Sequence, residues 1–464
     1  MRERLIALAA LLALSLAPFA GAATVSGALL AALTRASAAG MQVGAAVQAL
    51  SPRGLHLAYH ARLPLPPAST AKLFVTAAAL SALGPGFRYQ TTVVGGRPVH
   101  GVLDGSIALV GGGDPSLSAR ELDALASSVA RKVHLVRGQV VADASRFSGP
   151  PPIRWPRSGR RQGWYPRVSA LTLHDGNIGV TIAPTVPGRP PRVTVDPAGG
   201  DPVENLAVTG AAGTATALGV TRPHGATRII VTGRIALGHP RVKASVSIPD
   251  PVHFTLRLFT RDLKAHGVRV LGTPGLGSGP HVTLARVASA PLARLIRAQN
   301  RKSLNLYAEA LLRTLGAAQP AGVGSAAAGL AVMDGVLRRM GVAAPDLVDG
   351  CGLSALDRVS AADLVQLLVA AAHEPWFPDF IRSLPMAGPS HRLGGTLSSI
   401  GLFPGAPPDR IWAKTGNVGT AETLAGYVRS PGGLTAFAVL TNRDAAWTQG
   451  FDVGVAVAST LAGE

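Results

Sequence analysis

Hydrophobic and polar positions divide the chain into three stretches with different spacing. In the first stretch, apolar-rich runs at residues 47–50 and 55–59 flank the sequence Ser-Pro-Arg-Gly at 51–54, which predicts a β-hairpin. An alanine- and leucine-rich run at 70–83 then stops at Gly84-Pro85. This run predicts a helix, because proline cannot continue one.

The middle stretch, residues 92–290, consists mostly of short runs separated by glycine and proline, a pattern typical of strands and turns. We expect this region to form two subdomains, with an exposed, arginine-rich loop at 150–163. The predicted strands are 102–110, 138–142, 178–182, 192–195, 229–231 and 244–248, and the predicted helices are 119–132 and 252–266.

From residue 291 the spacing becomes helical and later returns to that of strands. The predicted helices are 292–299, 303–315, 326–340, 361–372 and 451–461, and the predicted strands are 410–414, 423–429 and 435–441. This order predicts an α/β (α+β) protein in which helices pack on a terminal antiparallel sheet that the N-terminal hairpin can join. We expect one discontinuous domain, 24–91 with 291–464, into which the strand-rich region 92–290 is inserted.

Residues 1–23 predict an export signal. Arg2 and Arg4 precede an apolar stretch at 5–16, and Ala-Gly-Ala at 20–22 offers a small-residue cleavage site. A membrane anchor is the alternative, but the stretch is shorter than the roughly 18–20 apolar residues that a span needs. We therefore expect an exported protein of the periplasm or cell envelope.

The composition adds a formal net charge of +19, from 44 Lys and Arg against 25 Asp and Glu. Such a charge attracts anionic partners. Nucleic acid is not expected, because the cations are scattered, aromatic residues make up only 5% of the chain, and the protein is predicted to be exported. An anionic wall or membrane surface fits better, and a purely solubilising role of the arginines is an equal alternative. The single cysteine excludes an intramolecular disulfide and a multi-cysteine metal site.

A serine and a lysine three residues apart begin the predicted helix at 70–83. In Ser69-Thr-Ala-Lys72 both side chains share one helix face and can form a hydrogen bond. A desolvated lysine near a second cation loses its proton readily and can then activate a serine hydroxyl. Lys72 is one of only six lysines, and it alone has a serine at this spacing. Taken by itself, the pair is better explained as a helix cap followed by a surface lysine.

Two further motifs each occur once in the chain. Ser303-Leu-Asn305 opens a predicted helix, where either residue could simply be an N-cap. Lys414-Thr415-Gly416 ends a predicted strand, and its glycine lets a substrate approach the strand edge closely. In this order the three motifs are typical of penicillin-binding proteins and class A β-lactamases, so coincidence is a poor explanation.

The long separation of the first two motifs narrows this resemblance. An insertion of strand-rich domains between Ser69 and Ser303 resembles the D-alanyl-D-alanine carboxypeptidase/endopeptidase family, the low-molecular-mass class C penicillin-binding proteins. The resemblance covers essentially the whole mature chain and implies the penicillin-binding-protein or β-lactamase-like fold. The further matching stretches are Gly-Gly-Gly-Asp-Pro-Ser-Leu at 111–117, Val-Ser-Ala-Leu at 168–171, Asp-Gly-Cys-Gly-Leu-Ser at 349–354, Leu-Pro-Met-Ala-Gly at 384–388, Gly-Thr-Leu at 395–397 and Leu-Ala-Gly-Tyr at 424–427.

The resemblance implies hydrolysis of peptidoglycan stem peptides and cross-links through an acyl-enzyme. Ser69 would attack the carbonyl of the penultimate D-alanine, and Lys72 would take its proton. Ser303 would relay a proton to the leaving amine, Asn305 would hold the substrate amide and Lys72, and Lys414 would add a positive field.

The same resemblance implies how the substrate is held. Thr415 would accept the terminal carboxylate beside Gly416, and the backbone amides of Ser69 and Asn417 would hold the oxyanion. No metal or cofactor is implied. The implied partners are a peptidoglycan peptide as substrate and β-lactam antibiotics as covalent inhibitors of Ser69.

The chain departs from the family pattern at several positions. Leu304 replaces the usual aspartate, and Cys351 replaces the usual serine, most simply as a small buried hydrophobe. Ala355 stands where relatives that bind meso-diaminopimelate place an arginine, and the loop 155–164 carries no acidic residue. We therefore expect weaker selection for the free end of diaminopimelate.

Two other functions remain open from the sequence. One is a β-lactamase or esterase on the same fold, and the other is a non-catalytic wall-binding protein whose site has decayed. The intact Ser69, Lys72, Ser303, Asn305, Lys414 and Thr415 argue against decay. The balance between carboxypeptidase and endopeptidase activity is not settled by the sequence.

Overall fold

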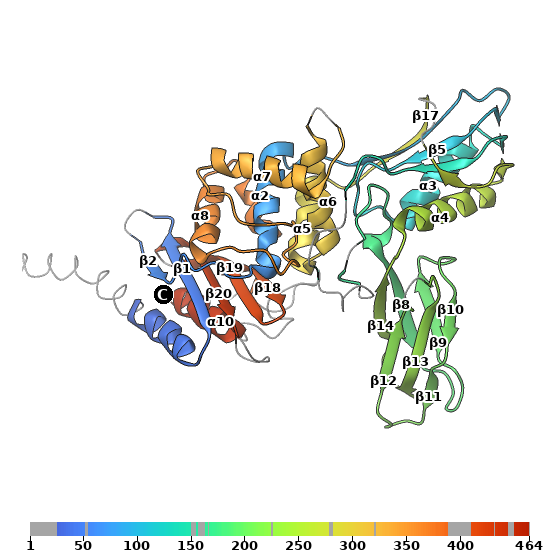
Figure 1. Cartoon of the computed structure of the whole chain (residues 1–464). Helices are drawn as coiled ribbons and strands as arrows, with labels where there is room; N and C mark the ends of the chain where they lie inside the picture. The colour runs from blue at the N-terminus through green and yellow to red at the C-terminus, as the bar shows by residue number, and fades with distance from the viewer. Residues whose placement is uncertain are drawn as a thin grey trace, which may run out of the picture. The chain divides into compact units, whose positions relative to one another are not determined.

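The computed structural model separates the chain into two compact units, each assembled from non-contiguous segments (Figure 1). The first unit comprises Met1–Pro85, Ile296–Ser303 and Leu330–Glu464, and the second comprises Gly86–Leu295 and Leu304–Gly329. The structure describes residues 26–51, 54–149, 155, 163–165, 167–223, 226–277, 282–319, 322–387, 410–430, 432–443 and 450–463. The predicted export signal, most of the arginine-rich loop and the stretch 395–397 lie outside these residues.

A five-stranded antiparallel sheet organises the first unit, with strand order β18-β19-β20-β1-β2. The N-terminal strand β1 pairs with β20 along its whole length, from Gln42↔Asn442 to Ala49↔Thr435, which confirms that the hairpin joins the C-terminal strands. The strands are β1 (Gln42–Ala49), β2 (His56–Tyr59), β18 (Ile411–Val418), β19 (Ala421–Ser430) and β20 (Gly433–Asn442).

Helices cover both faces of this sheet, and consecutive residues of its strands β1, β19 and β20 are therefore buried. One face packs on α10 (Gly450–Ala462) and on a helix over residues 26–38 that the sequence pattern did not predict. The other face, which includes the buried Tyr427, packs on α8 (Ala361–Ala372), where the Tyr427 hydroxyl donates to Leu368 O at 2.8 Å (Figure 1).

Helix α2 (Lys72–Leu83) is buried on all sides from Lys72 to Leu80 and forms the interior of the helical layer. It follows a 3-10 turn, η1 (Ala68–Ala71), and ends at Gly84, whose φ of 78° only glycine adopts readily. Its polar Thr76 receives a hydrogen bond from Gln299 Nε2 at 2.9 Å. Its neighbours include α5 (Leu292–Lys302) and α9 (Phe377–Ser383), and α7 (Ala326–Arg339) follows α5 further along the chain.

The second unit combines small sheets with three helices within the described residues. A five-stranded sheet has the order β16-β7-β5-β3-β17, and shorter sheets have the orders β15-β6-β4, β14-β8-β9 and β10-β13-β11 with β12 on β13. Its helices are α3 (Ala119–Ala130), α4 (Pro251–Ala265) and α6 (Asn305–Ala317). The strands are β3 (Gln90–Gly95), β4 (Val102–Leu103), β5 (Ile107–Val110), β6 (Leu135–Val136), β7 (Val140–Asp143), β8 (Asn177–Ala183), β9 (Arg192–Asp196), β10 (Val203–Asn205), β11 (Val208–Gly210), β12 (Ala217–Thr221), β13 (Ile229–Ala236), β14 (Val242–Ser247), β15 (Arg269–Val270), β16 (Gly275–Leu276) and β17 (Val282–Ala288).

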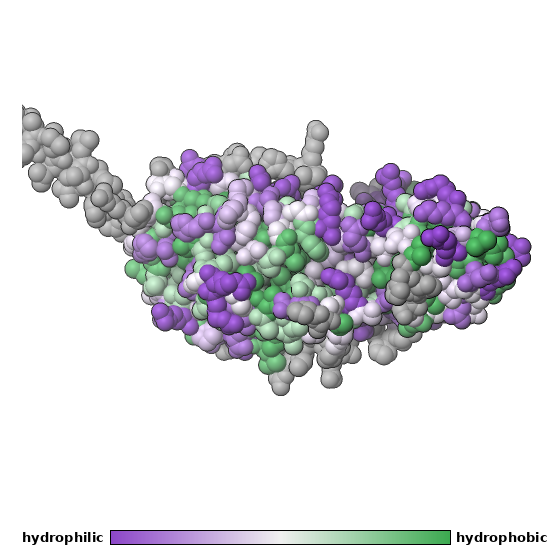
Figure 2. All heavy atoms as spheres, turned by 90° about the horizontal axis from the view of Figure 1, so that it is seen from above, coloured by the Kyte–Doolittle hydropathy of each residue, from purple (hydrophilic) through white to green (hydrophobic). Residues whose placement is uncertain are grey.

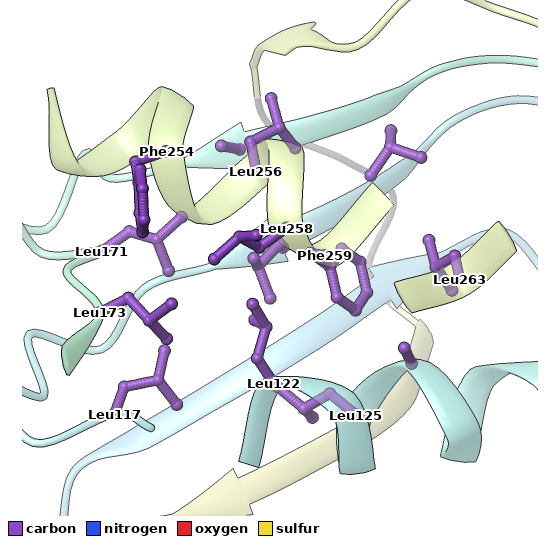
Figure 3. Packing of buried hydrophobic residues seen from close by; sticks show 14 of the residues in the cluster. Leu117, Leu122, Leu125, Leu171, Leu173, Phe254, Leu256, Leu258, Phe259 and Leu263 are labelled. Atoms are coloured by element: carbon purple, nitrogen blue, oxygen red, sulfur yellow. The ribbon is translucent and has the colours of Figure 1, made fainter. Parts of the chain in front are cut away.

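The core of the second unit lies where α3 and α4 pack together (Figure 3). Phe259 of α4 lies toward Leu122 of α3, Phe254 lies beside Leu171, and all four side chains are essentially removed from solvent. On the face of the molecule seen in Figure 2, hydrophilic and hydrophobic residues are interspersed, as expected for a chain whose cations are scattered.

Most predicted elements are confirmed, and two boundaries are wrong for identifiable reasons. The predicted strand 102–110 is two strands, β4 and β5, because Gly105 breaks it with a φ of 125°. The predicted helix 303–315 begins only at residue 305, because Ser303 has a φ of 54° and separates α5 from α6. Among the described residues, no helix has both the length and the apolarity that a membrane span requires.

Candidate active site

The two functional side chains of the first motif form a short, partly buried hydrogen bond. Ser69 lies in η1 and Lys72 begins α2, so that Lys72 Nζ donates to Ser69 Oγ at 2.7 Å. The Lys72 side chain is 0% exposed, whereas Ser69 is only partly buried. The turn is held by Thr70, whose hydroxyl donates to Pro67 O at 2.6 Å. The arrangement presents a reachable hydroxyl whose neighbouring amine is shielded from water.

A backbone carbonyl provides the second partner of Lys72. Lys72 Nζ donates to Cys351 O at 2.9 Å, and the buried Asp349 holds this loop in place. Asp349 Oδ1 accepts from the backbone N–H groups of Cys351 and Gly352, and Oδ2 accepts from that of Ser354 at 2.8 Å. Cys351 is buried, and its carbonyl rather than its thiol contacts the lysine.

The third motif lies on β18, the edge strand of the sheet, beside the serine. A Cβ on Gly416 would overlap Thr423 Oγ1 and lie 2.8 Å from Ser69 N. Only glycine therefore allows the strand to approach the turn this closely. Thr423 in turn donates to Pro67 O at 2.8 Å and fastens the sheet to the turn. The backbone of the Lys-Thr-Gly motif thus runs alongside the Ser69 amide.

Lys414 brings a second buried amine into this region. It is 1% exposed, and its Nζ donates to Thr415 O at 2.6 Å. Burial lowers the pKa of Lys414 well below the ordinary lysine value, and the charge of Lys72 lowers it further. Asn417, two residues beyond Thr415, is exposed and its Nδ2 contacts Glu422 Oε1 at 3.4 Å.

The second motif is divided between the two units. Ser303 ends the segment that belongs to the first unit, and Asn305 opens α6 in the second. Within the second unit, Asn305 Nδ2 donates to Trp164 O at 2.6 Å. Asn305 is 8% exposed, so this carbonyl satisfies a side-chain donor that has little access to water.

Two residues further along α6, Tyr307 donates its hydroxyl to Asp175 Oδ1 at 2.7 Å. Asp175 lies in η3 (His174–Gly176), where three consecutive residues have φ between 56° and 73°. Non-glycine residues are disfavoured in this region, so the turn is strained where it meets α6. Burial raises the pKa of Tyr307, and the charge of Asp175 adds to the shift, so the phenol stays protonated and donates.

Sequence reasoning missed several residues that contact the motifs. Asp349 and Cys351 lie in a stretch that had been matched to the family, but the role of the Cys351 carbonyl cannot be read from a side chain. Trp164 and Asp175 precede Asn305 and Tyr307 by more than a hundred residues, and no local pattern connects them.

Comparisons with known proteins identify the family of the chain. The model of the D-Ala-D-Ala carboxypeptidase 3 (S13) family matches residues 26–460. A D-alanyl-D-alanine carboxypeptidase from Actinomadura sp. (strain R39) is 36% identical over 395 residues, which cover 81% of this chain and 73% of that protein. The D-alanyl-D-alanine carboxypeptidase DacB of Haemophilus influenzae is 24% identical over 397 residues, covering 79% and 78% of the two chains.

The fold is also known from a solved structure. The crystal structure of penicillin binding protein 4 (dacB) from Haemophilus influenzae matches with a TM-score of 0.76 at 23% identity, covering 91% of this chain and 96% of that chain. The predicted penicillin-binding-protein fold is therefore confirmed. The chain belongs to the D-Ala-D-Ala carboxypeptidase (S13) family of serine peptidases. It is accordingly a serine-type D-Ala-D-Ala carboxypeptidase, as the motifs had predicted.

Tyr307→Phe tests whether the contact with Asp175 positions the Ser-x-Asn motif. We expect kcat/KM for a D-Ala-D-Ala peptide to fall about tenfold, because losing a buried hydrogen bond to a charged group costs about 1–3 kcal/mol. Tyr89→Phe is the matched control, since Tyr89 is equally buried and its hydroxyl contacts Thr314 at the far end of the same helix. Equal losses of activity at equal losses of thermal stability in both variants would show a merely structural role.

The lowered pKa of Lys414 leads us to expect that kcat/KM depends on pH. Because its lowered pKa lets the ammonium lose its proton below the pH at which an ordinary lysine titrates, we expect kcat/KM to decline early on the alkaline side. In Lys414→Arg the charge persists, so the alkaline decline should move to higher pH while the acidic limb stays in place. A pH-rate profile from pH 5 to pH 11 measures both limbs, and an unmoved alkaline limb would contradict the assignment.

Proposed function

We propose that the chain hydrolyses the terminal D-alanyl-D-alanine bond of peptidoglycan stem peptides, and the equivalent bond of cross-links, through an acyl-enzyme on Ser69. The observation that carries this proposal is the 2.7 Å hydrogen bond between Ser69 Oγ and the fully buried Lys72 Nζ. A neutral amine at this distance from the hydroxyl can accept the serine proton.

Acylation then proceeds with transfer of one proton from serine to lysine. Ser69 Oγ attacks the carbonyl carbon of the penultimate D-alanine while its proton moves to neutral Lys72. The Cys351 carbonyl keeps the resulting ammonium in place. When the peptide bond breaks, Ser303 relays a proton to the leaving amine, and free D-alanine or the cross-linked partner departs. Water later hydrolyses the ester and restores the Ser69 hydroxyl.

The edge strand supplies the substrate contacts. The backbone amides of Ser69 and Asn417 would hold the oxyanion, since the Gly416 backbone lies against Ser69 N. Thr415 would accept the terminal carboxylate, and the positive charge of Lys414 would favour both anions. Asn305 would hold the amide of the substrate. No step in this scheme uses a metal or cofactor.

Penicillin binding follows from the same nucleophile. A β-lactam presents a strained amide to Ser69, and the ring-opened ester would persist because no small leaving group departs to make room for water. A β-lactamase or esterase of the same fold would instead release the ester quickly. The family match over residues 26–460 favours the peptidase.

We further propose that the protein acts outside the cytoplasm, on the cell wall. The export signal predicted at residues 1–23 and the net charge of +19 support this location, because the carboxylates of the wall attract a basic protein.

Labelling with fluorescent penicillin tests the proposed nucleophile. We expect one covalent adduct per chain on the wild type, lasting for many minutes, and none on Ser69→Ala. Lys72→Arg should fold but acylate at least a hundredfold more slowly, because arginine cannot take the proton. Rapid turnover of the label would identify a β-lactamase, and the absence of any adduct on the wild type would refute the serine mechanism.

A second experiment tests the expected weak selection for diaminopimelate. Ala355 is exposed, and a nearby cation, Arg358, donates to its carbonyl at 3.0 Å. We expect less than a tenfold difference in kcat/KM between peptides with and without the free end of diaminopimelate. Ala355→Arg should increase the preference for the free carboxylate. A large preference in the wild type would overturn the expectation and would make Arg358→Gln the next variant to examine.

A further inference from the structure

We propose that the solvent face of the sheet β14-β8-β9 binds a carboxylate-bearing stretch of the peptidoglycan strand outside the catalytic centre. This inference rests on the proposed function and adds a second, polymer-specific binding surface to it. We call this surface the cationic face and define it by Thr181 and Ala183 of β8, Arg192 of β9, and Arg241 and Lys243 at the start of β14.

One side of the sheet packs on the core, and the other side faces solvent. Ile178, Val180 and Ile182 of the central strand β8 are fully buried in the core of the second unit. Because side chains alternate along a strand, Thr181 and Ala183 lie on the opposite side. Both side chains are small and partly exposed.

Exposed cations flank this central strand on both sides. The register places Arg192 of β9 opposite Ala183 and Lys243 of β14 opposite Thr181. Strands that flank a common neighbour are about 10 Å apart. Arg241 is exposed and immediately precedes β14, two residues before Lys243. One cation on the β9 side and two on the β14 side therefore flank the small side chains of β8.

These charges are available to a ligand. Among the residues that the structure describes, none of Arg192, Arg241 and Lys243 takes part in an ion pair. The acidic residue on this side, Asp196, is itself engaged by His174 at 3.2 Å. The three cations are therefore not paired with a carboxylate among the described residues, although Asp196 lies at the other end of β9.

The face runs toward the Ser-x-Asn motif within the same unit. At the far end of β8, a Cβ on Gly163 would overlap Ser245 Oγ and lie 2.7 Å from Asn177 Oδ1. The next residue, Trp164, supplies the carbonyl to which Asn305 donates. From Asn177 the strand rises about 13 Å to Thr181, opposite Lys243, and about 20 Å to Ala183, opposite Arg192. The cations therefore lie roughly one extended stem peptide away from this contact.

The chemistry of the polymer fits this geometry. An extended peptide spans about 3.3–3.6 Å per residue, so a terminal D-Ala-D-Ala unit cannot reach the cations whereas a whole stem peptide or its neighbour can. Stem peptides carry several carboxylates, which basic side chains bind from a distance and in combination. Single-stranded nucleic acid fits less well, because this face presents no aromatic side chain for stacking.

The test compares two triple variants of equal charge change on the full chain. The first, Arg192→Gln/Arg241→Gln/Lys243→Gln, removes the cationic face. The control, Arg120→Gln/Arg234→Gln/Lys264→Gln, removes two exposed arginines and one exposed lysine elsewhere in the second unit. Binding is measured by co-sedimentation with insoluble peptidoglycan freed of other wall polymers, in the Ser69→Ala background, and hydrolysis is measured on a soluble D-Ala-D-Ala peptide and on the polymer.

We expect the first variant to bind the polymer, and to release D-alanine from it, about tenfold less well. Its kcat/KM for the soluble peptide should stay within twofold of the wild type, as should every measurement on the control. Chemical amidation of the peptidoglycan carboxylates should weaken wild-type binding as much as the variant does.

Four outcomes would overturn the proposal. They are equal losses in both triple variants, a parallel loss on the soluble peptide, unchanged binding to amidated peptidoglycan, and wild-type binding only to peptidoglycan that retains its other anionic polymers. An inactive wild type on the soluble peptide would instead refute the proposed function, and the binding measurements in the Ser69→Ala background would still decide whether the cationic face exists.

Discussion

The burial of one lysine amine between a serine hydroxyl and a backbone carbonyl is the constraint on which this structure depends. A charged amine without water is costly, so Lys72 must be given partners and a rigid enclosure. Ser69 Oγ at 2.7 Å and Cys351 O at 2.9 Å are such partners. The enclosure follows from this need: α2 is buried on all sides, Asp349 holds the loop of Cys351, and Gly416 brings the edge strand against the Ser69 turn.

Two amines in one dry region also explain how the site can work near neutral pH. Burial and mutual repulsion oppose the double-charged state, so that at least one amine releases its proton more easily than lysine does in water. The amine hydrogen-bonded to Ser69 is placed to serve as the base, and Lys414 is placed to supply charge along the substrate strand. The different roles of the two lysines are set by their positions, since their side chains are chemically identical.

The insertion between the first two motifs contacts the start of α6. Its Trp164 carbonyl and Asp175 carboxylate hold Asn305 and Tyr307 at the start of α6. The strained turn at residues 174–176 is the kind of local cost that persists where surrounding structure requires it. The same unit carries the proposed cationic face, so the proposal places polymer binding and the Ser-x-Asn motif on one unit.

Local sequence determined much of this protein. Spacing of apolar residues, together with Gly84-Pro85, predicted α2, and the three motifs predicted the family because their chemistry requires particular side chains: only an amine can exchange the proton at position 72. Tertiary structure alone decided the rest. The start of α6 depends on the left-handed Ser303. Beyond the local Ser69, Lys72 contacts the Cys351 carbonyl, and Asn305 and Tyr307 contact groups more than a hundred residues away. Backbone atoms are the same in every residue, and long-range contacts leave no periodic trace, so these partners could be identified only once the chain was folded.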